Sequence, residues 1–275
     1  MPIRLAPEPL FEAAGLCLFM LSACVFGVAL EHPASPLRAW MDDALARRAC
    51  MGAAMGATAF AVIHSPWGRR SGAHINPAVT LAYLRLGRIG ARDAAWYVAA
   101  QVAGGICGVA AAAAMLGTAL ADASVRYVVT MPGAAGPGAA FAAELLISAV
   151  LMASVLWTSA HPRAARFTGT ICALLVAVYI TFEAPVSGMS MNPARTLASA
   201  VGAGDYAFLW LYLLAPSLGM LIAAEAWRRF GRCERPPCAV IAHDVRRCRY
   251  CNARAAGVNV PSRPSRPLAG RPIAE

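Results

Sequence analysis

The chain contains one short block twice. The first copy is Ser71-Gly-Ala-His-Ile-Asn-Pro-Ala-Val-Thr-Leu-Ala82, and the second, 116 positions later, is Ser187-Gly-Met-Ser-Met-Asn-Pro-Ala-Arg-Thr-Leu-Ala198. Aligned without a gap, they agree at eight of twelve positions. Asn is a favoured N-cap, and Pro fits the first helical turn because its missing N–H would have no partner there. Each block therefore predicts the start of a short helix.

Long apolar segments flank both blocks. The chain is 59% hydrophobic and 14% charged, whereas soluble domains carry about 25% charged residues. A membrane-spanning helix needs about 20 mostly apolar residues. A soluble helical protein fits poorly, because these runs are apolar on every face. Six segments have the required length, at about 9–31, 47–65, 94–120, 139–160, 167–186 and 206–227.

The duplication predicts how these segments are organised. We expect an all-α membrane protein with six transmembrane helices and two re-entrant half-helices in an inverted repeat. One repeat covers about 9–120 and the other about 139–227, within a transmembrane region at 1–230. The pairs Gly52/Gly56 and Gly104/Gly108 have the spacing that lets helix backbones approach closely.

The arginines predict the orientation in the membrane. One set of connections is rich in Arg, which places both termini in the cytoplasm by the positive-inside rule. The expected location is the plasma (bacterial inner) membrane. Of 24 basic residues, 11 lie at or after Arg228, so most of the net charge of +10 belongs to the tail, 231–275. We expect this Arg- and Pro-rich tail to be disordered and to meet anionic lipid rather than nucleic acid.

In this topology the two short helices enter from opposite sides and their N-termini meet near mid-membrane. Non-helical backbone at that depth is tolerated only where protein buries it or where it lines a water-filled cavity. A polar path through the protein is therefore expected.

At Asn76-Pro77-Ala78 and Asn192-Pro193-Ala194, with Arg195 directly after the second copy, the chain resembles the aquaporin family, also called major intrinsic proteins. The resemblance covers roughly residues 9–227. It implies six tilted helices and two half-helices, assembled as a homotetramer in the lipid bilayer with one pore in each subunit.

The paired asparagines have two interpretations. They are either plain helix caps, or caps whose free NH2 groups donate into a pore where two helix dipoles disfavour cations. Arg195 stands where the first copy has Val79, and its charge opposes the helix dipole. Either it extends to the interface, or, as the resemblance implies, it is the positive group of the outer constriction.

Alignment to the family adds Met51, Ile180 and Met189 to that constriction. Strict water channels carry a His and an aromatic residue among these positions, whereas this ring is apolar. Glycerol facilitators place an Asp where this chain has Thr196, which favours the water branch. The two indications disagree, and core packing is the alternative for the three apolar residues.

Three further polar residues complete the predicted site. Glu12 and Glu144 lie at matching places in the two halves, and a carboxylate at that depth needs a partner. The resemblance implies that they brace the loops before the half-helices; the alternative is a proton relay. His74 resembles a histidine that lines the cytoplasmic half of the pore, and structural hydrogen bonding is its alternative.

The tail holds Cys233, Cys238, His243, Cys248 and Cys251. In a reducing cytosol such cysteines are better metal ligands than disulfide partners, so a zinc knuckle is one hypothesis for the tail. No metal or other cofactor is expected in the transmembrane region. The insertion Ser65–Arg70, after His64, has no assigned role.

The sequence therefore predicts a passive channel for water, with small uncharged solutes as further substrates, that excludes ions and protons and is not an enzyme. A glycerol- or urea-type facilitator is the alternative. A secondary active transporter would need titratable groups where the repeats meet, and two neutral asparagines lie there. A junction protein with a closed pore is a fourth hypothesis, because the predicted ring is apolar.

Overall fold

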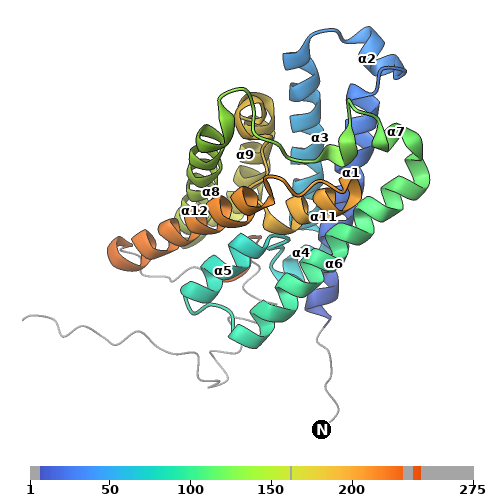
Figure 1. Cartoon of the computed structure of the whole chain (residues 1–275). Coiled ribbons are helices and arrows are strands. Elements are labelled where there is room, and N and C mark those ends of the chain that lie inside the picture. The colour runs from blue at the N-terminus through green and yellow to red at the C-terminus, as the bar shows by residue number, and fades with distance from the viewer. Residues whose placement is uncertain (1–6, 162, 232–237, 243–275) are drawn as a thin grey trace, which may run out of the picture.

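The computed structural model describes residues 7–161, 163–231 and 238–242 (Figure 1). All regular secondary structure in these ranges is helical. The long helices are α1 (Glu8–Glu31), α3 (Ala44–His64), α6 (Ala91–Leu116), α8 (Gly136–Ala160), α9 (Thr168–Phe182) and α12 (Leu209–Phe230). The shorter ones are α2 (Pro36–Trp40), α4 (Pro66–Ser71), α5 (Pro77–Arg85), α7 (Thr118–Ala121), η1 (Arg126–Val128), η2 (Ala165–Phe167), α10 (Ala184–Ser187) and α11 (Pro193–Ala203).

The six long helices lie on the six predicted spans, with corrected ends. Five helical segments of the described chain are long and apolar enough to cross a membrane, and α3 is the sixth long helix. The span predicted to reach 120 ends at Leu116, because Gly117 takes φ +56°. The span predicted for 167–186 is divided at Glu183 into α9 and α10.

The two halves of the chain pack in the same manner. In the first half α1 packs along α6, and in the second α8 packs along α12, while α3 and α9 join the halves. Each short helix reaches across: α5 packs mainly on α12, and α11 packs mainly on α6. The duplicated blocks are thereby brought together at the centre of the molecule (Figure 1).

Glycines permit the closest helix contacts, as their spacing predicts. A Cβ atom at Gly104 would lie 2.1 Å from the carbonyl oxygen of Ala13, where α6 crosses α1. A Cβ atom at Gly52 would lie 2.4 Å from the carbonyl oxygen of Ala177, where α3 crosses α9. Any side chain at these positions would push the helices apart.

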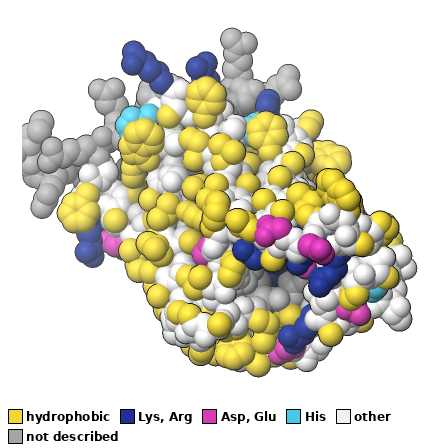
Figure 2. Space-filling model, turned by 90° about the horizontal axis from the view of Figure 1, so that it is seen from above, with side chains coloured by type: hydrophobic (Ala, Val, Ile, Leu, Met, Phe, Trp, Pro, Cys, Tyr) yellow, Lys and Arg dark blue, Asp and Glu magenta, His cyan; other side chains and the backbone are white. Residues whose placement is uncertain are grey.

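Large apolar side chains cover the outside of the helices. Leu10, Leu146 and Phe182 are each more than 60% exposed although they lie on apolar helices. Figure 2 shows apolar side chains over much of the visible face, with charged side chains gathered in limited areas. Such a surface suits hydrocarbon and not water, and the protein is an integral membrane protein.

The insertion at 65–70 forms a short helix. The side chain of Ser65 caps α4 by accepting a hydrogen bond from the N–H of Gly68 at 2.9 Å. Arg70, near the end of α4, lies 3.5 Å from the carboxylate of Glu8. The insertion therefore fastens the start of α1 next to the first duplicated block.

Candidate functional site

Both short helices begin at the asparagine that the sequence predicts. The side-chain oxygen of Asn76 accepts from the N–H of Ala78 at 2.8 Å, and that of Asn192 accepts from the N–H of Ala194 at 3.1 Å. Proline occupies the first turn in each case. The duplicated blocks are therefore two capped helix N-termini.

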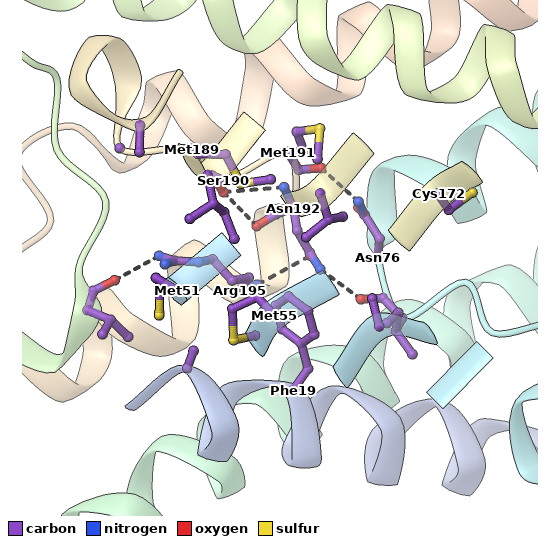
Figure 3. A pocket seen from close by; sticks show the side chains of 18 of the residues that line it. Phe19, Met51, Met55, Asn76, Cys172, Met189, Ser190, Met191, Asn192 and Arg195 are labelled. Carbon is purple, nitrogen blue, oxygen red and sulfur yellow. Dashed lines mark hydrogen bonds between the residues drawn. The ribbon is translucent and has the colours of Figure 1, made fainter. Parts of the chain in front are cut away.

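The two asparagines also bind the two halves to each other. The Nδ2 atom of Asn76 donates to the carbonyl oxygen of Met191, and that of Asn192 donates to the carbonyl oxygen of Ile75, both at 2.7 Å (Figure 3). Each amide thus uses one of its two N–H groups in a hydrogen bond to the loop of the other half. This differs from the expectation that the whole NH2 group is free, because the two loops approach within hydrogen-bonding distance.

The loops before the short helices share a strained backbone. Ala73 and Ile75 in the first copy have φ of 52° and 40°, and the equivalent Met189 and Met191 have φ of 50° and 52°. Positive φ costs a non-glycine residue about 1–3 kcal/mol and persists only where surrounding structure fixes it. The residues with positive φ therefore occupy equivalent positions in the two halves.

Two buried carboxylates bind these loops. Glu12 accepts from the Ser71 hydroxyl at 2.7 Å and from the N–H groups of His74 and Ile75 at 3.1 and 2.5 Å. Glu144 accepts the equivalent set from Ser187, Ser190 and Met191, at 2.8, 2.6 and 2.8 Å. Both side chains are fully buried.

Two tyrosines that the sequence analysis did not single out complete the same arrangement. The hydroxyl of Tyr97 donates to the carbonyl oxygen of Ser71 at 2.7 Å, and the hydroxyl of Tyr212 donates to that of Ser187 at 2.5 Å. They follow their serines by 26 and 25 residues. This near-equal spacing was a signal in the sequence that could have identified them.

A cavity of about 250 Å³ passes between the halves. Asn76, Asn192, Arg195 and His74 border it. The three apolar residues of the predicted ring also border it, namely Met51, Ile180 and Met189. The remaining predicted lining residues, Pro77, Ala78, Pro193 and Ala194, are instead buried in the first turns of α5 and α11. They shape the helix starts, and their side chains do not border the cavity.

Arg195 is directed into the molecule and not to the lipid interface. Its guanidinium donates to the carbonyl oxygen of Val128 at 2.8 Å and lies beside the cavity with Met51 (Figure 3). Val128 belongs to η1, where Arg126, Tyr127 and Val128 all have positive φ. No local sequence pattern marks this loop as a partner of Arg195.

Thr196 belongs to a buried hydroxyl cluster. Its Oγ1 lies 2.5 Å from the hydroxyl oxygen of Ser190 and 2.9 Å from that of Thr130. Thr196 is 2% exposed. The residue therefore links the second loop to the segment after η1.

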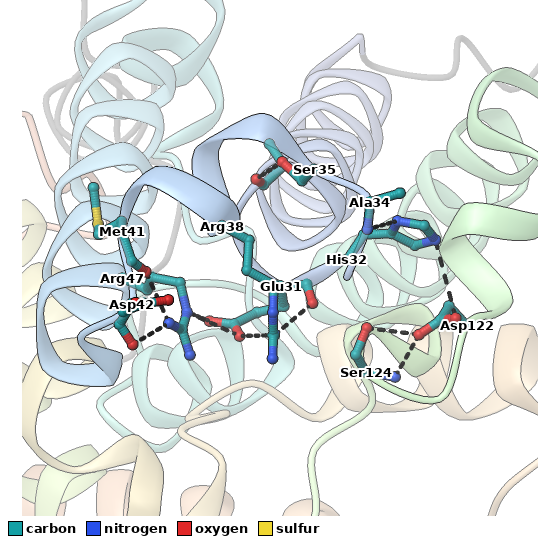
Figure 4. Close-up of polar contacts among 11 residues, drawn as sticks. Glu31, His32, Ala34, Ser35, Arg38, Met41, Asp42, Arg47, Asp122 and Ser124 are labelled. Atoms are coloured by element: carbon teal, nitrogen blue, oxygen red, sulfur yellow. Dashed lines mark hydrogen bonds and ion pairs between the residues drawn. The ribbon is translucent and has the colours of Figure 1, made fainter.

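Charged residues lie at one end of the cavity, where Glu31 and Arg48 border it. Glu31 accepts from Arg38 and from Arg47, each at 3.2 Å (Figure 4). Nearby, hydrogen bonds from the side chain and backbone of Ser124 hold the pKa of Asp122 below its ordinary value.

At the other end of the cavity the chain returns to the loop before α5, where the N–H of Ile241 donates to the carbonyl oxygen of Gly72. The described part of the tail, Cys238–Ala242, lies there, and Ile241 borders the cavity. The ring of His74 is 2% exposed, with Nδ1 at 3.1 Å from Thr80 Oγ1 and Nε2 at 3.0 Å from the carbonyl oxygen of Ala239. These described tail residues therefore pack against the loop before α5.

The zinc hypothesis concerns residues that mostly lie outside the described ranges, namely Cys233, His243, Cys248 and Cys251. Cys238 is described, at a partly buried position. Within the described residues, no group of three or more His, Cys, Asp or Glu side chains could hold a metal ion.

An all-helical membrane fold with two half-helices meeting at one cavity defines a channel-type protein. The family model for the major intrinsic proteins matches residues 8–227. The chain belongs to this family, whose fold is that of passive channels and not of enzymes.

Known relatives include proteins named for different solutes. Aquaporin NIP1-3 of Oryza sativa subsp. japonica is 36% identical over 62% of this chain and 58% of its own length. Glycerol uptake facilitator protein-like 6 of Lactiplantibacillus plantarum is 34% identical over 69% of this chain and 86% of its own. The aquaglyceroporin from Plasmodium falciparum has a TM-score of 0.67 at 18% identity, covering 81% of this chain and 95% of that one. The chain thus spans less than two thirds of the plant relative.

Proposed function

We propose that the protein is a passive channel that conducts water, and with it small uncharged solutes, while excluding ions and protons. The observation that carries this proposal is the cavity bordered by both cap asparagines and by Arg195. Residues 1–230 would form the channel, and 231–275 a cytoplasmic tail.

The electrostatics of the site support the exclusion of ions. The N-termini of α5 and α11 meet at the asparagines, and each carries about +0.5 of an elementary charge. Arg195 adds a full positive charge beside the same cavity. A cation would leave its water shell to meet positive potential, whereas a water molecule can turn its oxygen toward the N–H donors. Glu12 and Glu144 would brace the loops that hold these donors.

A second candidate is a facilitator of glycerol or urea. Met51, Ile180 and Met189 give the Arg195 side of the cavity an apolar wall, which suits the carbon backbone of a polyol. The relative named as a glycerol uptake facilitator-like protein favours the same candidate. The hydroxyl of Thr196 is hydrogen-bonded to those of Ser190 and Thr130, and Thr196 supplies no carboxylate.

The assembly and orientation are proposals as well. We expect a homotetramer in the plasma membrane, with both termini in the cytoplasm, because Arg69, Arg70 and the basic tail lie on one side in the predicted topology. A reporter fused to the C-terminus would test the orientation, and the mass of the detergent-solubilised protein would test the assembly.

The function is tested by stopped-flow light scattering on proteoliposomes, with an impermeant osmolyte and then with glycerol. We expect faster water efflux than in protein-free liposomes. Arg195→Val gives the second copy the residue that the first copy has at Val79. We expect it to raise glycerol permeability relative to water permeability, since it removes the charged side chain beside the apolar wall. No water or glycerol flux above protein-free liposomes, for the full chain or for a chain ending at Gly231, would refute the proposal.

A further inference from the structure

The described part of the tail, Cys238–Ala242, packs against the core of the protein, which its sequence does not predict. Ala239, Val240 and Ile241 are 0%, 2% and 5% exposed. Ala239 and Ile241 belong to the same apolar cluster as the first loop and as the core between α8 and α12. These residues are as well buried as the helices that form the channel.

One backbone hydrogen bond and one from a side chain hold the segment on the loop before α5. The N–H of Ile241 donates to the carbonyl oxygen of Gly72 at 3.1 Å, and the carbonyl oxygen of Ala239 lies 3.0 Å from Nε2 of His74. Gly72 has φ +104°, and a Cβ atom there would lie 2.4 Å from the carbonyl oxygen of Ala239. The loop before α5 therefore supplies Gly72, which permits the close approach and accepts a hydrogen bond, and His74, whose ring nitrogen contacts the segment.

The segment also meets the cavity. Ile241 borders it near Ile63, at the end of α3 away from Arg48. Both ring nitrogens of His74 lie within hydrogen-bonding distance of protein groups, Thr80 Oγ1 and the carbonyl oxygen of Ala239. A branched apolar side chain thus borders this end of the cavity, which in the proposed channel would be one mouth of the pore.

We propose that residues 238–242 are a plug, a segment of the chain's own tail that closes this mouth of the pore and must leave it for full conduction. The inference rests on the proposed channel function. Closure by few contacts is a two-state equilibrium, and minor states of such equilibria are typically populated at roughly 0.1–10%. Removal of the plug is therefore expected to raise water permeability per protein by roughly tenfold or more.

The test measures water permeability of proteoliposomes holding the full chain, a chain ending at Gly231, or the full-length variant Ile241→Asp. The aspartate would bury a charge among apolar residues, and so favours the released segment. Val260→Asp places the same kind of change further along the tail as the matched control. A plug at one mouth blocks flow in both directions, so random insertion into the liposomes does not disturb the comparison.

We expect the shortened chain and Ile241→Asp to conduct alike and well above the full chain, with Val260→Asp equal to the full chain. Equal conduction by all four proteins would overturn the plug and leave the channel function standing, as would slower conduction by Ile241→Asp. No conduction by any of them would refute the channel function, and the plug with it. Far-UV circular dichroism of each variant establishes that helix content is retained.

Discussion

Replacing Glu144 by Gln tests whether this carboxylate holds the second loop. The carboxylate accepts from the Ser187 hydroxyl, from the N–H of Ser190 and from the N–H of Met191. A hydrogen bond to a charged group contributes about 1.5–3 kcal/mol net, and one between neutral groups about 0.5–1.5 kcal/mol. Glutamine retains the size of the side chain but has one oxygen and one NH2 group, which is a donor only.

The best placement of that glutamine keeps its oxygen on the two partners of Oε1, Ser187 and Ser190. Both bonds then lose their charge, at about 1 kcal/mol each, and the N–H of Met191 faces a donor, at about 1–3 kcal/mol. We therefore expect Glu144→Gln to destabilise the protein by about 3–5 kcal/mol. The strained backbone of Met189 and Met191 should relax with it.

The assay is thermal unfolding in detergent, followed by intrinsic fluorescence, with water permeability measured on the same preparations. Glu225→Gln is the matched control, because Glu225 forms its ion pairs with exposed arginines, where solvent screening weakens them. The control should lose much less stability than Glu144→Gln does. If Glu144→Gln also unfolds with the wild type, the carboxylate does not hold the loop.

Two further substitutions test the frame of the site. Tyr212→Phe removes the donor to the Ser187 carbonyl oxygen, and it should lower stability by about 1 kcal/mol, seen as a lower unfolding temperature; an unchanged temperature would mean that the bond is not formed. Gly104→Val places a side chain against Ala13 and should prevent a stable fold, judged by recovery as a monodisperse species. Gly138→Ala, where a Cβ atom meets nothing within 4 Å, should be tolerated, and equal recovery of both variants would contradict the close helix contact.

Local patterns predicted most of the fold. Asn-Pro at 76–77 and 192–193 determines a helix start by capping alone, so both short helices begin where the sequence indicates. Apolar length likewise located the long helices. The ends were less well predicted, since Gly117 and Glu183 interrupt helices within runs that are apolar overall.

The candidate site was only partly predictable, because many of its contacts join distant segments. The bond from Arg195 to Val128 spans 67 residues, and the contact of His74 with Ala239 spans 165. No local pattern records such pairs. The tyrosines were different, because Tyr97 and Tyr212 recur at nearly equal distances from the duplicated serines, and a comparison of the two halves beyond the twelve-residue block would have found them.

Water permeability of proteoliposomes containing the chain that ends at Gly231 tests the central claim most directly, because this protein lacks the proposed plug. A passive channel predicts that vesicles shrink faster than protein-free vesicles of the same lipid, and equally fast with and without an imposed proton gradient. Shrinkage at the rate of protein-free vesicles, from protein shown to be folded, would contradict the claim that this cavity conducts water.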